Sequence, residues 1–100
     1  MAYPTANTPL RIGAYPTGSN NANAIIDEVA IWAGTDLRND VSTIYNSGAP
    51  NNLNDNGLTA PTTWYRMGDA DTSPNLTDNG SGGDNATMYN VSTFSTDVPT

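Results

Sequence analysis

The amino-acid sequence predicts an all-β chain that carries one short α-helix. The chain has 100 residues, which is enough for one small domain. Nine of its ten acidic residues are aspartate, and Asn, Thr, Ser and Gly are abundant. These small polar side chains bond to nearby backbone groups and disfavour helix interiors, so they are typical of turns and strands. The apolar residues fall in short runs between polar segments, as expected of short strands.

The first clear strand covers residues 26–32 (IDEVAIW). Its apolar side chains fall on both faces and are rich in β-branched and aromatic types, so we expect other elements to cover both faces. Asp27 and Glu28 are adjacent, so their side chains should point to opposite faces and should not share a site. Beside a buried strand, Asp27 is expected to bond the amides of a neighbouring loop.

A short helix is predicted after this strand. Its apolar residues recur at i, i+4, i+7 and i+8, which is one helical face: Leu37, Val41, Ile44 and Tyr45. Asp36 or Asn39 is the expected N-cap. Gly48 can take the left-handed conformation that closes the last turn, and Pro50 prevents continuation. The last two apolar residues of the helix should dock it against the sheet near Trp32.

Short strands and polar segments make up the rest of the chain. Residues 1–9 should be extended, further strands are expected at residues 10–15, 62–67 and 86–91, and loops at residues 16–24 and 68–84. Residues 51–61 (NNLNDNGLTAP) have the composition of a linker that only Leu53 and Leu58 can anchor. Residues 78–83 (DNGSGG) offer several positions for the positive φ of a tight reversal. Phe94 should anchor the tail.

Two blocks of the sequence resemble parts of a known superfamily. Residues 26–32 followed by residues 41–48 (VSTIYNSG) are similar to the closing strand and helical turn of laminin-G-like, concanavalin A-type jelly rolls. Residues 64–69 (WYRMGD), 78–83 and 85–88 (NATM) are similar to the opening strands of such a domain. A closing motif followed by an opening motif is found in structural proteins of bacteriophages.

The resemblance implies a partial or minimal jelly-roll-like β-sandwich. Residues 1–50 would be the closing strands and helix, residues 51–61 a linker, and residues 62–100 the start of a sandwich. Complete domains of this superfamily are clearly longer than this chain. The chain is therefore expected to complete its sheets with neighbouring copies or with another structural protein.

Charge and composition exclude several function classes. A net charge of −7 repels nucleic-acid phosphates and anionic lipids, so neither nucleic acid nor membrane is an expected partner. The sequence has no His, Cys or Lys, which removes the common general bases, the thiol nucleophile and the usual transition-metal ligands. Residues 1–10 lack the features of a signal peptide, and no apolar run approaches a membrane span.

Calcium is the one cofactor that the sequence offers ligands for. Asp69, Asp71, Asp78 and Asp84, together with Asn79, could donate oxygens to this hard cation. Their spacing does not match an EF-hand loop, and clusters of Asp, Asn and Gly are ordinary turn formers. The pattern therefore favours turns over a metal site.

Aromatic side chains are the other candidate site. Tyr15 and Tyr89 are the candidate sugar-stacking residues, whereas Trp32, Trp64, Tyr65 and Tyr45 are more typical of core packing. A glucanase-like pair of carboxylates is disfavoured, because residues 26–28 match the closing strand and not a catalytic one.

These observations favour a non-enzymatic structural component of a bacteriophage virion, as capsid decoration or as a tail-associated β-sandwich. Such a protein would be assembled in the host cytoplasm, and its partners would be other copies of itself or another virion structural protein. The alternative is a carbohydrate-binding adhesion module that binds a glycan. Extensive contacts between chains would favour the first hypothesis, and a concave aromatic face with bound calcium would favour the second.

Overall fold

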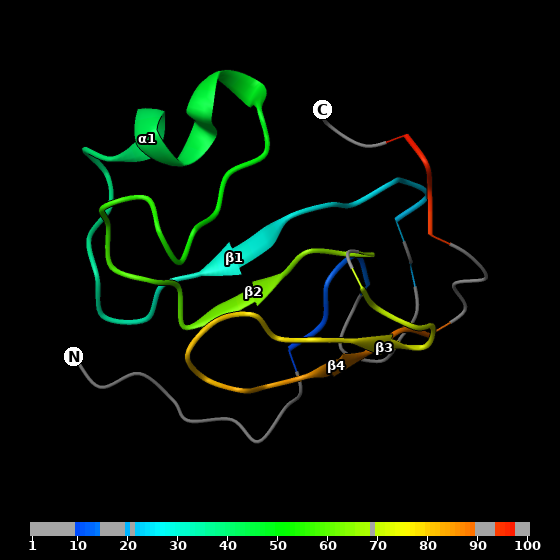
Figure 1. The fold of residues 1–100 in the computed structure, drawn as a ribbon. Helices are drawn as coiled ribbons and strands as arrows, with labels where there is room; N and C mark the ends of the chain where they lie inside the picture. The colour runs from blue at the N-terminus through cyan, green and yellow to red at the C-terminus, as the bar shows by residue number, and fades with distance from the viewer. Residues whose placement is uncertain (1–9, 15–19, 21, 69, 90–93, 98–100) are drawn as a thin grey trace.

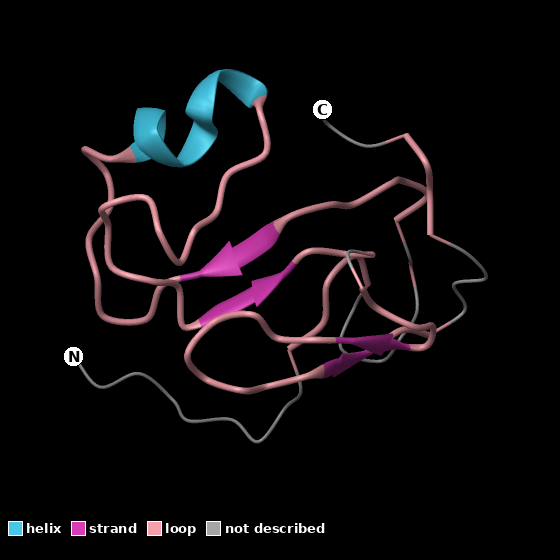
Figure 2. Cartoon of the chain, in the orientation of Figure 1, coloured by secondary structure: helices cyan, strands magenta, loops and turns pink. Residues whose placement is uncertain are grey.

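The computed structural model describes residues 10–14, 20, 22–68, 70–89 and 94–97 (Figure 1). In chain order the elements are strand β1 (Val29–Ile31), helix α1 (Val41–Tyr45), 3-10 helix η1 (Asn46–Gly48), and strands β2 (Thr63–Tyr65), β3 (Asn75–Leu76) and β4 (Ala86–Thr87). The strands form two small antiparallel sheets, β1–β2 and β3–β4, beside one short α-helix (Figure 2). The prediction of a mostly-β chain with one short helix is confirmed at this level.

The β1–β2 sheet lies at the centre of the molecule. Its register pairs Val29 with Tyr65 and Ala30 with Trp64. Because side chains alternate along a strand, Trp64 and Ala30 share one face of the sheet, and Tyr65 and Val29 share the other. In the view of Figure 1, α1 lies to one side of this sheet and the β3–β4 pair to the other.

The core is built around β2. Trp64 is only 2% exposed, and the other buried apolar residues are Tyr65, Leu53, Leu76 and Pro61. Two of these side chains belong to β2, and the others come from segments that fold back onto it. A core of this size leaves many large apolar side chains at the surface.

Residues 78–82 run alongside β2 and the residues before it. The amides of Asn79, Ser81 and Gly82 donate to the backbone oxygens of Trp64, Pro61 and Thr62, respectively, at 2.8–3.0 Å. The two backbones are so close that a Cβ on Gly80 would lie 2.5 Å from the Thr62 oxygen. Residues 78–83 offer several positions that can take positive φ, but of these only Gly83 has it (φ +69), while Gly80 and Gly82 allow close backbone approach instead.

Residues 51–61 connect the helix to β2 and take part in the packing. Leu53 is buried, as predicted for an anchor, whereas Leu58 is half-buried. The Asn51 side-chain amide donates to the Thr43 oxygen at 2.8 Å, and the Trp32 indole N–H donates to the Thr59 oxygen at 2.8 Å. Strands from either side of this segment pair with each other in the β1–β2 sheet.

β1 is shorter than predicted. Glu28 has a left-handed backbone (φ +53), which interrupts the extended conformation, and the strand begins only at Val29. The prediction that both faces of residues 26–32 are covered is wrong for this chain, since Ile26 and Ile31 are each 39% exposed. Among the described residues, β2 is the one strand that pairs with β1, and it covers only part of the apolar surface of residues 26–32.

A helix forms in the predicted segment, but it begins later than predicted, at Val41, and neither expected N-cap, Asp36 or Asn39, precedes its first turn. Asp40 does, without a side-chain cap, while the Asp36 carboxylate accepts the Arg38 amide in the preceding turn. Tyr45 is 66% exposed, so its predicted docking is wrong, and Ile44 is the half-buried residue of that face. Gly48 has φ +82, as predicted, but α1 already ends at Tyr45, where Asn46 takes the left-handed C-cap conformation, and Gly48 is the last residue of η1.

The remaining predicted strands are only partly present. Residues 10–14 are not in a strand, and β4 covers just the first two residues of the predicted strand at 86–91. Residues 90–91 lie outside the described residues. β3 forms inside the predicted loop 68–84 and was missed, because a two-residue strand has no pattern of its own. The Phe94 ring is half-buried, and a Cβ on Gly68 would lie 3.4 Å from it.

Candidate functional site

Asp78 connects β2 to the turn that follows β3. Its Oδ1 atom accepts the amides of Trp64 and Gly80 at 2.8 and 2.7 Å, and its Oδ2 atom accepts the amide of Asp84 at 2.9 Å. Its own amide donates to the Asn85 side chain at 2.9 Å. We call residues 78–84, closed in this way, the Asp78 turn. The carboxylate satisfies three backbone donors that the fold would otherwise leave without acceptors.

The surroundings of Asp78 change its acidity. Burial alone would raise its pKa, but the hydrogen bonds from the amides of Trp64, Asp84 and Gly80 and from the Thr63 hydroxyl favour the charged form more strongly. The pKa of Asp78 is therefore held below its usual value. The carboxylate stays ionised over a wide pH range, which suits a structural acceptor.

Tyr65 reaches the same turn from β2. Its hydroxyl donates a short hydrogen bond to the backbone oxygen of Asp84. Burial raises the pKa of this phenol, and the negative charges of Asp78 and Asp84 raise it further. The group therefore remains a neutral donor well into the alkaline range.

Within the described residues, the candidate calcium ligands do not form one site. The Asp71 carboxylate accepts the amides of Gly68 and Thr77, so it closes a turn of its own. Asp84 is exposed, and Asp69 lies outside the described residues. The Asn79 side chain donates to the oxygens of Trp64 and Thr77. Within the described part of the chain, no group of three or more acidic side chains could hold a metal ion.

The aromatic residues divide between core and surface. Tyr89 is 72% exposed, with the Arg11 guanidinium 6.0 Å from its ring centre, whereas Tyr15 lies outside the described residues. Trp64 and Tyr65 are buried, and Trp32 is half-buried. The core assignment of Trp64 and Tyr65 thus agrees with the structure, while Tyr45 lies at the surface.

A cluster of three side chains joins the start of β1 to β2. The Trp64 indole N–H donates to Glu28 Oε2 at 2.7 Å, and the Arg66 Nε–H donates to Glu28 Oε1 at 3.4 Å. The Arg66 guanidinium also stacks over the Trp64 ring, 5.0 Å from its centre. The ion pair is about one-third exposed on each side. We call this set the Glu28–Arg66–Trp64 cluster.

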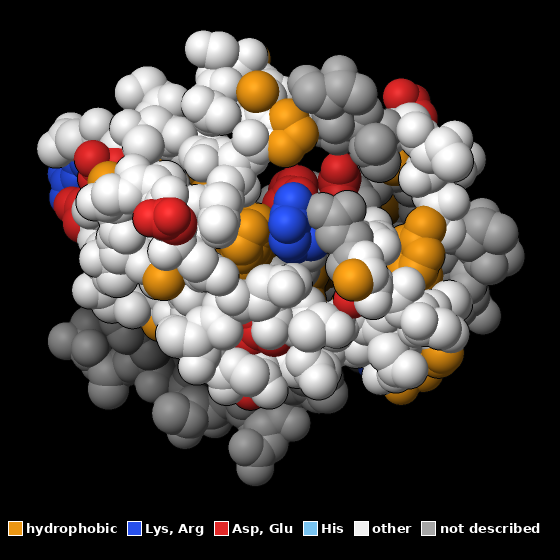
Figure 3. All heavy atoms as spheres, in the orientation of Figure 1, with side chains coloured by type: hydrophobic (Ala, Val, Ile, Leu, Met, Phe, Trp, Pro, Cys, Tyr) orange, Lys and Arg blue, Asp and Glu red, His pale blue; other side chains and the backbone are white. Residues whose placement is uncertain are grey.

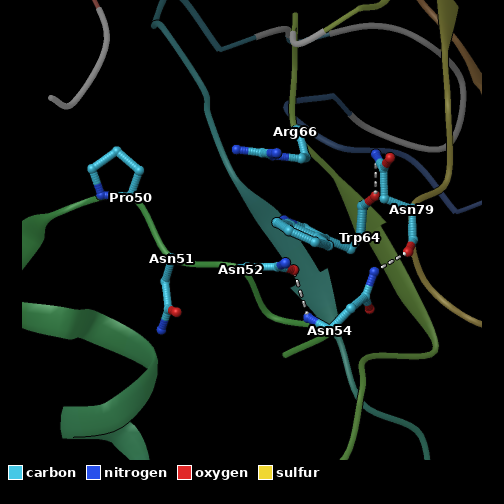
Figure 4. Close-up of a pocket in the computed structure, with 7 residues that line it drawn as sticks. All are labelled: Pro50, Asn51, Asn52, Asn54, Trp64, Arg66 and Asn79. Carbon is cyan, nitrogen blue, oxygen red and sulfur yellow. Dashed lines mark hydrogen bonds between the residues drawn. The ribbon is translucent and has the colours of Figure 1, made fainter. Parts of the chain in front are cut away.

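A shallow hollow opens on one side of the Glu28–Arg66–Trp64 cluster. It has a volume of about 360 Å³, and Figure 4 shows its lining: Pro50, Asn51, Asn52, Asn54, Trp64, Arg66 and Asn79. The Asn54 amide group donates to the Asn79 backbone oxygen at 2.9 Å, which joins the two sides of the hollow. We call this the polar hollow, because side-chain amides make up most of its wall.

A larger groove opens on the other side of Arg66. It has a volume of about 600 Å³ and lies between α1 and the residues that follow β2. Its apolar walls come from Ile44, Tyr45, Leu53, Met67 and Phe94, and its charged residues are Asp27, Glu28 and Arg66. We call this the apolar groove. Figure 3 shows a depression on the same face of the molecule, where acidic and basic side chains meet apolar ones.

Asp27 and Glu28 both line the apolar groove, so the prediction that they point to opposite faces is wrong. The left-handed backbone of Glu28 breaks the alternation on which that prediction depended. Asp27 does not bond a neighbouring loop either, because its Oδ1 accepts the amide of the next residue, Glu28. The acid that ties two loops together is Asp78.

The Glu28–Arg66–Trp64 cluster was not predicted from the sequence. Glu28 and Arg66 are 38 positions apart, so no local spacing links them. One signal was present in the composition, since Glu28 is the only glutamate in a chain that otherwise uses aspartate. The longer side chain spans the distance from the start of β1 to the indole of Trp64.

Comparisons with known proteins gave no relative. The chain matches no protein-family model, no curated protein and no solved structure. Within the described residues, no helix is long and apolar enough to cross a membrane.

Proposed function

We propose that this chain is a non-enzymatic structural component of a bacteriophage virion, part of a jelly-roll-like sandwich in a capsid decoration or a tail-associated structure. It acts through protein–protein contacts, in a particle assembled in the host cytoplasm. The observation that carries the proposal is the uncovered apolar surface around β1. The resemblance of the closing and opening motifs to phage structural proteins points in the same direction.

The outer edge of β1 supports this proposal. The Trp64 amide and oxygen bond Asp78 and Asn79, away from β1. Trp64 and its partner Ala30 are therefore a non-hydrogen-bonded pair, and the backbone groups of Ala30 point to the outer edge. Among the described residues, no strand pairs with β1 on that edge.

Exposed apolar residues flank this edge. Ile25, Ile26 and Ile31 are all exposed, next to a sheet of only two strands. Two strands are marginally stable alone, and an open edge with apolar neighbours is a template for pairing with another chain. A strand from another chain would cover the edge and bury these isoleucines.

Three carboxylates in the described part of the chain support a non-enzymatic role. Asp78 accepts three backbone amides, Asp71 accepts two, and Glu28 bonds Arg66 and Trp64. A carboxylate that performs acid–base work must reach a substrate, and these three are engaged within the protein.

Mass spectrometry of density-purified virions that encode this chain tests the proposal. We expect the chain in a fixed stoichiometry to the major capsid protein, with crosslinks from residues near β1 to another virion chain. The matched control is a non-structural protein of the same phage, which purification should remove. If the chain is lost together with that control, it is not a virion component.

A carbohydrate-binding adhesion module is the second candidate function. The polar hollow favours it, because side-chain amides beside an Arg and a Trp edge suit sugar hydroxyl groups. The exposed ring of Tyr89 offers a separate stacking surface. A glycan array would test it. Asn52→Ala should lose the binding signal if the glycan binds in the polar hollow, and Tyr89→Ala should lose it if the glycan stacks on the Tyr89 ring.

A further inference from the structure

We propose that the apolar groove is the docking site for a basic segment of a different protein, which inserts one apolar side chain between α1 and Phe94 and places Lys or Arg beside Asp27. The inference rests on the proposed structural role and names the kind of partner. The groove is separate from the outer edge of β1, where a strand would add.

The lining of the groove suits an inserted apolar side chain. Its volume of about 600 Å³ lies within the range of pockets that bind small ligands, so it also has room for neighbouring residues of the partner. Leu53 is buried at its base, while Ile44, Met67 and Phe94 are half-buried and Tyr45 is exposed at its rim. These residues retain apolar surface that an anchor side chain would remove from water.

The charges of the groove select a basic partner. Asp27 and Glu28 bring two negative charges and Arg66 brings one positive charge, which leaves one net negative charge. Glu28 bonds Arg66 and Trp64, whereas the Asp27 carboxylate accepts the Glu28 amide beside it. Asp27 is therefore the rim carboxylate placed to meet a cation from the partner.

The charge of the whole chain argues against a second copy as the occupant. Each chain carries a net charge of −7, with three arginines as its only basic side chains. Arg38 is paired with Asp36, and Arg66 is paired with Glu28. Two copies would repel each other during encounter, whereas a basic partner would be attracted.

Titration of the full ¹⁵N-labelled chain with short Gly/Ser peptides tests the proposal. The probe peptide carries a leucine between two lysines, and the matched peptides replace the leucine with serine or the lysines with glutamate. We expect amide shifts at Ile44, Met67 and Phe94 for the probe peptide, weakened by salt. Loss of the leucine should weaken binding about tenfold or more.

Two variants of the chain sharpen the test. Asp27→Asn keeps an oxygen for the Glu28 amide but removes the charge, and we expect about two- to fivefold weaker binding of the probe peptide. Asp36→Asn is the control, because Asp36 lies in the exposed turn before α1, outside the groove, and should leave affinity unchanged. The amide spectrum of each variant shows directly whether it is folded.

Several outcomes would overturn the proposal. These are equal binding of the lysine and glutamate peptides, shifts confined to β1 or Tyr89, and no binding of the probe peptide. Concentration-dependent self-association that shifts the same groove amides without peptide would assign the groove to a second copy. The result is independent of the virion test, since the chain could be absent from particles yet bind the peptide, or be present and fail to bind it.

Discussion

The two sides of the β1–β2 sheet differ in how completely the chain itself supplies their hydrogen-bond partners and buries their side chains. On the β2 side, the Asp78 turn supplies acceptors and donors to Trp64, Thr62 and Pro61, and the side chains there are buried. On the β1 side, Ile25, Ile26 and Ile31 are exposed beside an open strand edge. The contrast indicates that the β2 side holds the fold together and that the β1 side is available for another chain.

The largest expected effect concerns the β2 side. Asp78→Ala removes the acceptor of three backbone amides, one buried (Trp64) and two part-buried (Gly80 and Asp84), and this loss should cost about 3–5 kcal/mol. Urea denaturation followed by Trp fluorescence measures this loss. Asp78→Asn is the control, because its oxygen can replace Oδ1 but its amide cannot accept the Asp84 amide, so an intermediate loss is expected. A change below about 0.5 kcal/mol in Asp78→Ala would mean that the Asp78 turn does not hold β2.

Close backbone approach gives the next effect. A Cβ on Gly80 would lie 2.5 Å from the Thr62 oxygen, and backbone cannot move aside as a flexible side chain does, so Gly80→Ala should cost about 1–3 kcal/mol. Gly83→Ala is the control, since its Cβ would meet nothing within 4 Å and only the left-handed backbone is strained. That change should cost about 1–2 kcal/mol. Thermal unfolding of both variants would show whether Gly80 is the costlier position. A larger loss of stability in Gly83→Ala than in Gly80→Ala would mean that residues 78–82 lie farther from β2.

Acidification should weaken the same side of the sheet. The pKa of Asp78 is lower in the folded chain than in the unfolded one, so its contribution to stability is fully present above the unfolded value of about 3.9. The contribution is lost as the pH falls through the folded pKa, where the carboxylate gains a proton and stops accepting amides. The loss should be smaller than that of Asp78→Ala, because a protonated carboxyl group keeps one good acceptor. Denaturation curves from neutral to acidic pH measure it, and Asp78→Asn should lack this component. Equal acid sensitivity of the two proteins would assign the effect to other carboxylates.

The sequence predicted the features of the fold that depend on residue type and local position. The positive φ of Gly48 and the burial of Leu53 both follow from residue type and position alone. The extent of β1 did not follow, because the left-handed backbone of Glu28 is held by contacts with Trp64 and Arg66 far along the chain. The elements that cover the apolar residues of β1 could not be predicted either, since a pattern of apolar side chains does not show whether the same chain or another one covers them.

The candidate sites show the same limit. The sequence singled out Asp78 as a candidate ligand or turn former, but its bonds to Trp64 and Asp84 depend on how β2 and the Asp78 turn meet. The apolar groove was not predicted, because its walls come from α1, residues 51–61 and Phe94 together. Sites assembled from separate segments need the fold before they can be seen.

The smallest effect on stability is expected on the β1 side. Ile25 is 64% exposed, so Ile25→Ser should change the free energy of unfolding of the isolated chain by no more than about 0.5 kcal/mol. Leu76→Ala is the matched control on the β2 side, where a buried leucine should cost about 2–5 kcal/mol. If the β1 side serves another chain, Ile25→Ser should nevertheless reduce incorporation of the chain into virions, measured against the capsid protein in purified particles. A large loss of stability in Ile25→Ser would show that the isolated chain already covers this residue, and normal incorporation would show that the virion contact lies elsewhere.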